Sequence, residues 1–314
     1  MAEKRQSAAQ TLKEIMGWRP AFASVLQAFE PILSAQEEAA SALCACAKDS
    51  GLSLPPVQNN RLEQGVSLLM GESLTGTAPT VQYCADRLLP LLSSLDALAA
   101  QATSLSTFFA HCHEGDGQIS DTLVNAVAGN DEDALSSLAR AEGVEPSLLG
   151  FTAGFVVGPV LHALVVNSFV DGAALWEGIW RQGYCPVCGA LPTISWLDKR
   201  VVDEKNAFLV GGGGKKHLHC FVCGADWTFR RGACPACGKE GSGVLEFLRE
   251  SGTSHGERVE WCTSCKGYLP NVDLREREFV PHLDALALGM MHLDMVAARN
   301  KLRPLHPTFW NIPS

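Results

Sequence analysis

Four Cys-x-x-Cys pairs lie in the second half of this chain of 314 residues, and they use eight of its twelve cysteines. The pairs are Cys185 with Cys188, Cys220 with Cys223, Cys234 with Cys237, and Cys262 with Cys265. A tetrahedral zinc or iron ion takes four thiolates at about 2.3 Å, and two such turns that face each other supply them. Glycine follows three of the pairs directly, where it eases a backbone conformation with positive φ. Four pairs at this spacing predict metal sites.

The order of the pairs predicts how they group. CPVCG at 185–189 is followed after 31 residues by CFVCG at 220–224, and CPACG at 234–238 is followed after 24 residues by CTSCKG at 262–267. Consecutive grouping joins the first two pairs and the last two, whereas a cross-braced grouping joins the first pair with the third. We expect consecutive grouping because it closes shorter loops. It predicts two metal ions, Fe or Zn, which at the least hold together two small lobes that lack a core of their own.

Two other uses of Cys-x-x-Cys are disfavoured. Thiol–disulfide catalysis needs a thiol of low pKa at a helix N-terminus in a βαβ setting, and here the pairs precede glycine and short strands. A nucleic-acid-binding zinc ribbon needs positive charge, but residues 181–270 carry 12 Lys and Arg against 9 Asp and Glu. Two four-thiolate sites holding divalent ions add about −2 each and bring this module to about −1. Lys215, Lys216, Arg230 and Arg231 are then better explained as a solvated loop than as a phosphate-binding patch.

The remaining reactive side chains are expected to be structural. Cys44, Cys46 and Cys84 are interpreted as small buried thiols, and the His-Cys-His run at 111–113 as a helix end. His217 and His219 flank Cys220, where hydrogen bonding behind the ligands or a surface position suits them better than the replacement of a thiolate. The sequence contains no Ser-His-Asp arrangement, phosphate-binding loop or dinucleotide-binding glycine pattern that we can defend, so we predict that the protein is not an enzyme.

The elements that must position these cysteines change character near residue 180. Before it, apolar residues recur at three- and four-residue intervals and predict a bundle of six to eight helices, interrupted by prolines such as Pro31 and Pro90. After it, short β-like runs appear: TISWL, NAFLV and GVLEFL. Helical periodicity returns over about 275–301, before a proline-rich aromatic tail.

Location is predicted from charge and hydropathy. Residues 1–180 hold 8 Lys and Arg against 20 Asp and Glu, so the acidic surface belongs to the helical half. The first residues lack the apolar core of a secretory signal, and we expect a cytoplasmic protein, in which twelve cysteines call for an explanation other than disulfides. Leu148–Val170 is long enough to cross a bilayer, but Pro159, His162 and Asn167 interrupt it, so a buried core helix is expected rather than membrane insertion.

The sequence from GIWRQGYCPVCGALPTISWL through HLHCFVCGADWTFRRGACPACG to VEWCTSCKGYLP, with the HPTFW tail, resembles the formate dehydrogenase accessory protein family of the FdhE type. The resemblance covers roughly residues 178–314. It implies a mainly α fold with small β structure, divided into a helical domain (1–180), two rubredoxin-like or zinc-ribbon metal lobes (181–228 and 229–272), and a C-terminal helix with its tail (273–314).

The resemblance also implies that the eight paired cysteines are metal ligands, with iron the suspected metal. It implies a cytoplasmic assembly and maturation factor that binds the catalytic subunit of a respiratory formate dehydrogenase before export. The alternative is a rubredoxin-like protein that passes an electron to this client. The first hypothesis tolerates Zn and the second requires Fe, because zinc has no redox chemistry.

Overall fold

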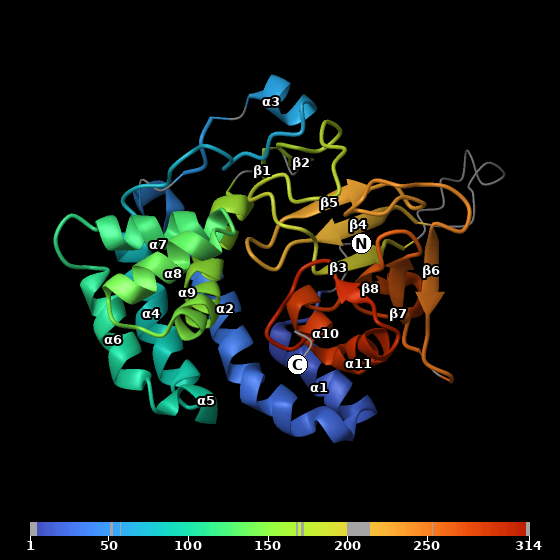
Figure 1. Cartoon of the computed structure of the whole chain (residues 1–314), viewed down its shortest axis with the longest axis horizontal. Helices are drawn as coiled ribbons and strands as arrows, with labels where there is room; N and C mark the ends of the chain where they lie inside the picture. Colours follow the sequence, from blue (N-terminus) through green and yellow to red (C-terminus); the bar gives the residue numbers. More distant parts are fainter. Residues whose placement is uncertain are drawn as a thin grey trace.

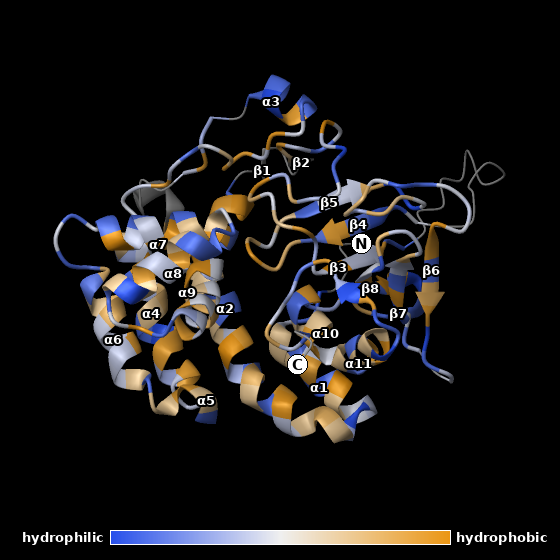
Figure 2. Ribbon diagram, in the orientation of Figure 1, coloured by the Kyte–Doolittle hydropathy of each residue, from blue (hydrophilic) through white to orange (hydrophobic). Residues whose placement is uncertain are grey.

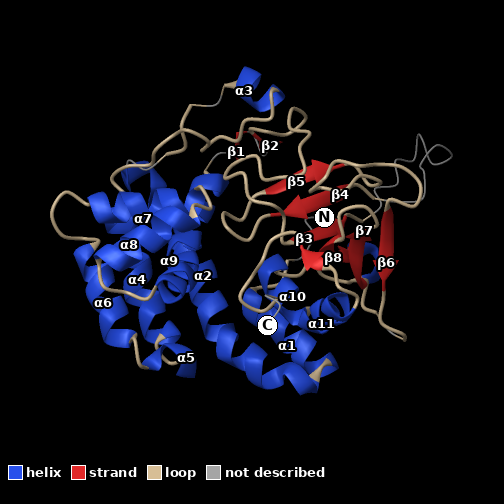
Figure 3. Cartoon of the chain, in the orientation of Figure 1, coloured by secondary structure: helices blue, strands red, loops and turns tan. Residues whose placement is uncertain are grey.

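The computed structural model describes residues 5–50, 53–56, 58–167, 169–170, 173–199, 214–252 and 254–311. The predicted β-like run NAFLV, at 206–210, lies outside these residues. Figures 1 and 3 show a helical region on one side of the molecule and a twisted sheet on the other, with the last helices and the first helix below the sheet.

The helical region contains nine α-helices among the described residues, rather than the six to eight expected, because α3 and α5 are short segments of five and four residues. Ser7 begins α1 with a capping box, and Asp131 caps α8 through its side chain. Pro31 and Pro90 lie inside helices instead of ending them, which corrects the prediction. Figure 2 shows apolar and hydrophilic residues mixed along α2 and α4, as in helices that bury one face. The bounds are α1 (Ala8–Trp18), 3-10 helix η1 (Pro20–Phe22), α2 (Ala23–Ser50), α3 (Asn59–Glu63), α4 (Ala78–Leu92), α5 (Asp96–Ala99), α6 (Ala102–His111), α7 (Gln118–Ala128), α8 (Glu132–Ala141) and α9 (Pro146–Val166).

Helix α9 is the core helix of this region. It packs against α2, α4, α7 and α8, and twelve of its residues are buried. Among the described residues it is the one helix with the length and hydropathy of a membrane span, and 67% of its most apolar window of 18 residues is buried inside the protein. The helix formed by the predicted apolar run Leu148–Val170 ends at Val166, four residues before the end of that run.

One sheet of seven strands carries both pairs of cysteine turns. Its order is β5-β4-β3-β8-β7-β6, and β9 adds to the start of β8. Strands β3 to β5 come from the first predicted lobe and β6 to β8 from the second, and they join where β3 runs parallel to β8, with Ser195 opposite Asn271. The bounds are β3 (Ile194–Leu197), β4 (Lys216–His219), β5 (Asp226–Phe229), β6 (Leu245–Leu248), β7 (Glu257–Cys262), β8 (Gly267–Asp273) and β9 (Arg303–Pro304), with β1 (Phe169–Val170) and β2 (Ala173–Ala174) forming a separate pair.

The helix expected over 275–301 is divided. A 3-10 turn, η2 (Leu274–Glu276), is followed by extended chain at Arg277, and two helices come after it, α10 (Leu283–Gly289) and α11 (Met291–Arg299). Pro281 disfavours a helical conformation at the residue before it, and Gly289 is a poor helix former. Helix α10 packs against α1, so the first helix and the C-terminal helices lie together below the sheet (Figure 1).

Candidate metal centres

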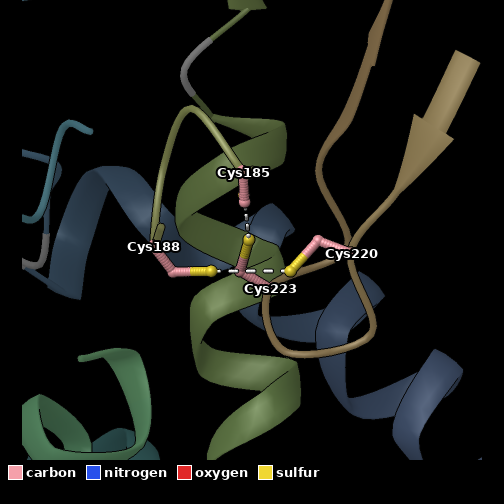
Figure 4. A group of neighbouring side chains, drawn as sticks. All are labelled: Cys185, Cys188, Cys220 and Cys223. Atoms are coloured by element: carbon pink, nitrogen blue, oxygen red, sulfur yellow. Dashed lines mark hydrogen bonds between the residues drawn. The ribbon is translucent and has the colours of Figure 1, made fainter. Parts of the chain in front are cut away.

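The first four cysteines point at one another from two loops. Cys185 and Cys188 lie in the loop before β3, and Cys220 and Cys223 in the turn between β4 and β5 (Figure 4). The Sγ atoms of Cys185 and Cys223 are 3.5 Å apart, and those of Cys188 and Cys220 are 3.4 Å apart. All four residues are buried, and Cys188 has the largest exposed fraction, 9%.

The last four cysteines form a second cluster on the other half of the sheet. Cys234 and Cys237 lie between β5 and β6, Cys262 ends β7, and Cys265 follows it. The Sγ atoms are 3.7 Å apart both between Cys234 and Cys265 and between Cys237 and Cys262. This cluster is open on one side, because Cys237 and Cys265 are exposed.

Both clusters have the shape that one tetrahedral ion requires. Four sulfurs at about 2.3 Å from a central ion stand about 3.8 Å apart, and in each cluster all four sulfur atoms lie within 4.8 Å of one another. The two four-cysteine groups can hold two metal ions, and all-thiolate donors suit zinc and iron alike. The observed grouping is the consecutive one, not the cross-braced alternative.

The turns that carry the cysteines follow one pattern. In the first, the N–H of Cys185 donates to the carbonyl of Ala190 at 2.8 Å, and the N–H of Gly189 donates to the carbonyl of Cys185 at 3.0 Å. Gly189 and Gly224 have φ of +80° and +71°, as the sequence predicted. At Gly224 a side chain would also meet the ring of His162, 3.0 Å from an added Cβ.

Hydrogen bonds within each cluster favour one thiolate. Burial would raise the pKa of Cys220, but hydrogen bonds from Cys185, Cys188 and Cys223 lower it well below its usual value. Burial also opposes ionisation of Cys262, yet hydrogen bonds from the backbone of Cys265 and Ser264 lower its pKa to about 7. Each cluster thus has a sulfur already disposed to lose its proton, as binding of a metal ion requires.

His219 occupies a position that the sequence did not predict. Its ring lies between two carboxylates, with Nδ1 3.0 Å from Asp226 and Nε2 3.0 Å from Asp284 of α10. Burial opposes its charge, but Asp284 and Asp226 hold the pKa of His219 well above its usual value. His219 therefore ties the first lobe to α10, while His217 stacks on Trp196 at 3.9 Å. Neither histidine takes the place of a thiolate in the four-cysteine groups.

Among the other candidate residues, some have the structural roles that the sequence predicted and one does not. Cys84 is fully buried, which raises its pKa to about 12 and makes it inert, and His111 ends α6 as expected. Cys44 is only partly buried and Cys46 is exposed, so the prediction of buried thiols is wrong for Cys46. The sequence does not reveal that Cys46 is exposed, because a single small cysteine does not show on which side of a long helix it lies.

The four cations singled out in the sequence divide into two kinds. Lys216 is buried and pairs with the carboxylate of Glu260 in β7. Lys215, Arg230 and Arg231 line a hollow together with Arg181 and the buried Lys216, and Arg230 also pairs with Glu240.

Sequence reasoning missed the contact that covers the first cluster. The segment Ser67–Leu69, more than one hundred residues earlier in the chain, runs along the first cysteine turn. Leu68 and Leu69 donate their N–H groups to the carbonyls of Pro186 and Val187 at 2.8 and 2.9 Å, and Ser67 Oγ donates to the carbonyl of Cys185 at 2.8 Å. No local signal marks this segment, because its partners are set by the packing of the helical region on the lobe.

Comparisons with known proteins give similarities of one kind. The chain is 28% identical over 155 residues to a protein from Aquifex aeolicus described as "Protein FdhE homolog", which covers 49% of this chain and 50% of that protein. It is 30% identical over 116 residues to a homologue of the same description from Shewanella baltica, covering 36% and 34%. It is 28% identical over 151 residues to "Protein FdhE" of Escherichia coli, covering 46% and 44%. The matches thus span half or less of the length of these curated relatives.

The fold similarity covers nearly the whole chain. The crystal structure of the FdhE protein from Pseudomonas aeruginosa aligns with 96% of this chain and 93% of its own, with a TM-score of 0.60 and 20% sequence identity. This likeness shows the fold. No protein-family model matches the chain.

Proposed function

We propose that this chain, which is similar to FdhE proteins in sequence and has the fold of one of them, is an accessory protein in the maturation of a formate dehydrogenase. The observation that carries the proposal is the combination of FdhE similarity with two complete four-cysteine groups on one sheet. In this proposal the eight cysteines are the ligands of two ions, Fe or Zn.

The finer part of the proposal concerns the client. The protein binds the catalytic subunit of a respiratory formate dehydrogenase in the cytoplasm, before that subunit is exported. The sequence resemblance supports this role, and the helical region is acidic, with 20 Asp and Glu against 8 Lys and Arg over residues 1–180. No reaction is assigned to the chain itself.

The metals act as scaffold in this proposal. Four of the six main strands of the sheet have only four residues, and an ion held by four cysteines would cross-link the turns beside them. The half-exposed second cluster favours a second candidate function, in which an iron ion there passes an electron to the client. That function excludes zinc at this cluster.

Affinity purification from a cytoplasmic extract tests the partner class. We expect the tagged chain to recover a formate dehydrogenase catalytic subunit that still bears its signal peptide. A Cys46→Ser chain serves as a matched control, because Cys46 is an exposed thiol outside both clusters. Recovery of RNA or DNA at physiological salt, with no such subunit, would contradict the proposal.

A further inference from the structure

The two four-cysteine groups differ in how far a molecule from solvent can approach their sulfurs. In the first cluster the exposed fractions are 0% for Cys185, Cys220 and Cys223 and 9% for Cys188. In the second, Cys234 and Cys262 are 1% exposed, but Cys237 and Cys265 are exposed. One cluster is therefore closed and the other has two sulfur ligands at the surface.

The closed cluster is covered by residues from outside its own lobe. Ser67–Leu69 form three hydrogen bonds along the first cysteine turn, and His162 of α9 lies against Gly224 in the second turn. Phe221, between Cys220 and Cys223, contacts Phe155 of α9 and Trp310 of the tail. Residues of the helical region and the tail thus pack on both cysteine turns of this cluster.

The open cluster is bordered by its own lobe, by Gly183 of the first lobe against Pro235, and by β9 of the tail. Cys234 donates its N–H to the carbonyl of Lys239, and Lys266 donates its own to the carbonyl of Cys262, both within the second lobe. Strand β9 pairs with β8 beside this cluster, and the N–H of Arg303 donates to the carbonyl of Lys266 at 3.0 Å. These contacts lie beside Cys265 and leave its side chain and that of Cys237 exposed.

We propose that the second four-cysteine group is an exchangeable metal site, which an external soft ligand such as a thiol or a chelator can enter, while the first retains its ion permanently. Exchange at a zinc thiolate site replaces the four metal–sulfur bonds one after another by bonds to the incoming ligand, with no change of oxidation state, and each released thiolate takes a proton from water. The incoming ligand must therefore approach the ion, and the exposed Cys237 and Cys265 allow this at the second cluster. The inference rests on the two-metal part of the proposed function and is independent of the client.

Zinc release from the purified full-length chain tests the inference. With the coloured chelator 4-(2-pyridylazo)resorcinol in excess, we expect one equivalent of zinc to leave at least tenfold faster than the other. Adding N-ethylmaleimide after the fast phase should label the cysteines of the second cluster and leave those of the first unlabelled. Cys46, exposed from the start, provides an internal measure of labelling.

Two matched variants show which cluster releases the fast zinc equivalent and which releases the slow one. Cys237→Ser should abolish the fast equivalent and Cys188→Ser the slow one. Release of both ions in a single phase, or labelling of Cys185, Cys188, Cys220 or Cys223 after the fast phase, would overturn the inference even if Cys188→Ser fails to fold. Uptake of fewer than two zinc ions by the unmodified chain would overturn the two-metal assignment as well, whereas failure to recover a formate dehydrogenase would contradict only the proposed client.

Discussion

At the level of single residues, charge in the interior is balanced by partners from distant parts of the chain. Glu257 is buried between Arg19, at 2.6 Å, and Arg277, at 2.5 Å. His219 lies between Asp226 and Asp284 in the same way. A metal ion in each four-cysteine group would likewise balance thiolates that burial alone disfavours. These buried charges are paired, and each pair links two elements of the fold.

Removal of one thiolate should remove one ion. Cys185→Ser and Cys262→Ser should each lower the metal content from two ions per chain to about one, because three thiolates no longer complete a tetrahedral site. Cys84→Ser, a change at a buried cysteine outside both clusters, should keep both ions. Elemental analysis of anaerobically purified protein measures this, and two ions in either cluster variant would contradict the ligand assignment.

Asp294 should make the stability depend on pH. Burial raises its pKa from 3.8 to about 7, although hydrogen bonds from Tyr268 and Trp310 act in the opposite direction. Between about pH 4 and pH 7 the folded chain holds a proton that the unfolded chain has lost, so the free energy of unfolding should fall as the pH rises through this window. The effect is on the order of 2–4 kcal/mol.

Asp294→Asn provides the comparison, since an amide still accepts the hydrogen bond from Tyr268 at this position. Urea unfolding at pH 4, 5.5 and 8 should show the wild-type chain losing stability relative to the variant with rising pH. A constant difference between the two chains would show that the pKa of Asp294 does not change on folding, and would contradict this prediction.

At the level of elements, the two lobes meet through backbone as well as through the sheet. Gly183, two residues before the first cysteine, lies so close to the second cluster's turn that an added Cβ would stand 2.0 Å from the carbonyl oxygen of Pro235. Pro235 lies between Cys234 and Cys237. The first turn of one lobe is thus held against the first turn of the other.

Gly183→Ala should separate these turns. The neighbouring atoms belong to the backbone and cannot turn away as a flexible side chain would, so we expect a loss of about 1–3 kcal/mol in the free energy of unfolding. Gly232→Ala is the control, because nothing lies within 4 Å of an added Cβ there. The measurement is thermal or denaturant unfolding of both variants. Equal stability of the two would mean that the lobes tolerate displacement at this contact.

At the level of the whole molecule, the metal lobes, the helical region and both termini form interlocking contacts. Gln6 donates its N–H to the carbonyl of Val280 at 2.8 Å, so the start of the chain is attached beside α10. In the tail, Phe309 contacts Phe29 and Phe155 of the helical region. Segments near both ends of the described chain thus connect the sheet, the C-terminal helices and the helical region.

Exchange of iron for zinc tests whether the metals act only as scaffold. Because both ions accept the same tetrahedron of thiolates, we expect the two forms to have the same fold and to bind a formate dehydrogenase catalytic subunit equally. We also expect the zinc form to support maturation. Pull-down with each form and formate oxidation in cells supplied with each form measure the two steps. Normal binding by the zinc form without formate oxidation would favour the electron-transfer function.

Local sequence patterns were enough to predict the mainly helical fold class and the grouping of the eight cysteines in the candidate metal centres. Cys-x-x-Cys spacing is a local property, because two intervening residues suffice to turn the backbone, and the shorter loops favoured the consecutive grouping that the structure has. The expected β-like runs at TISWL and GVLEFL contain β3 and β6, because strand propensity is read from a few adjacent residues. The resemblance to FdhE proteins also followed from these local motifs.

Tertiary packing alone sets which cluster is closed and how the lobes are joined. The parallel contact of β3 with β8, the cover of Cys185 by Ser67 and the position of His219 against Asp284 all link residues far apart in the sequence. Hydrophobic periodicity in the sequence shows which face of a helix or strand is buried. It does not show which distant element packs on that face. The first and third motifs, CPVCG and CPACG, differ at one residue, yet Cys188 is buried and Cys237 is exposed, because different segments pack against the two turns.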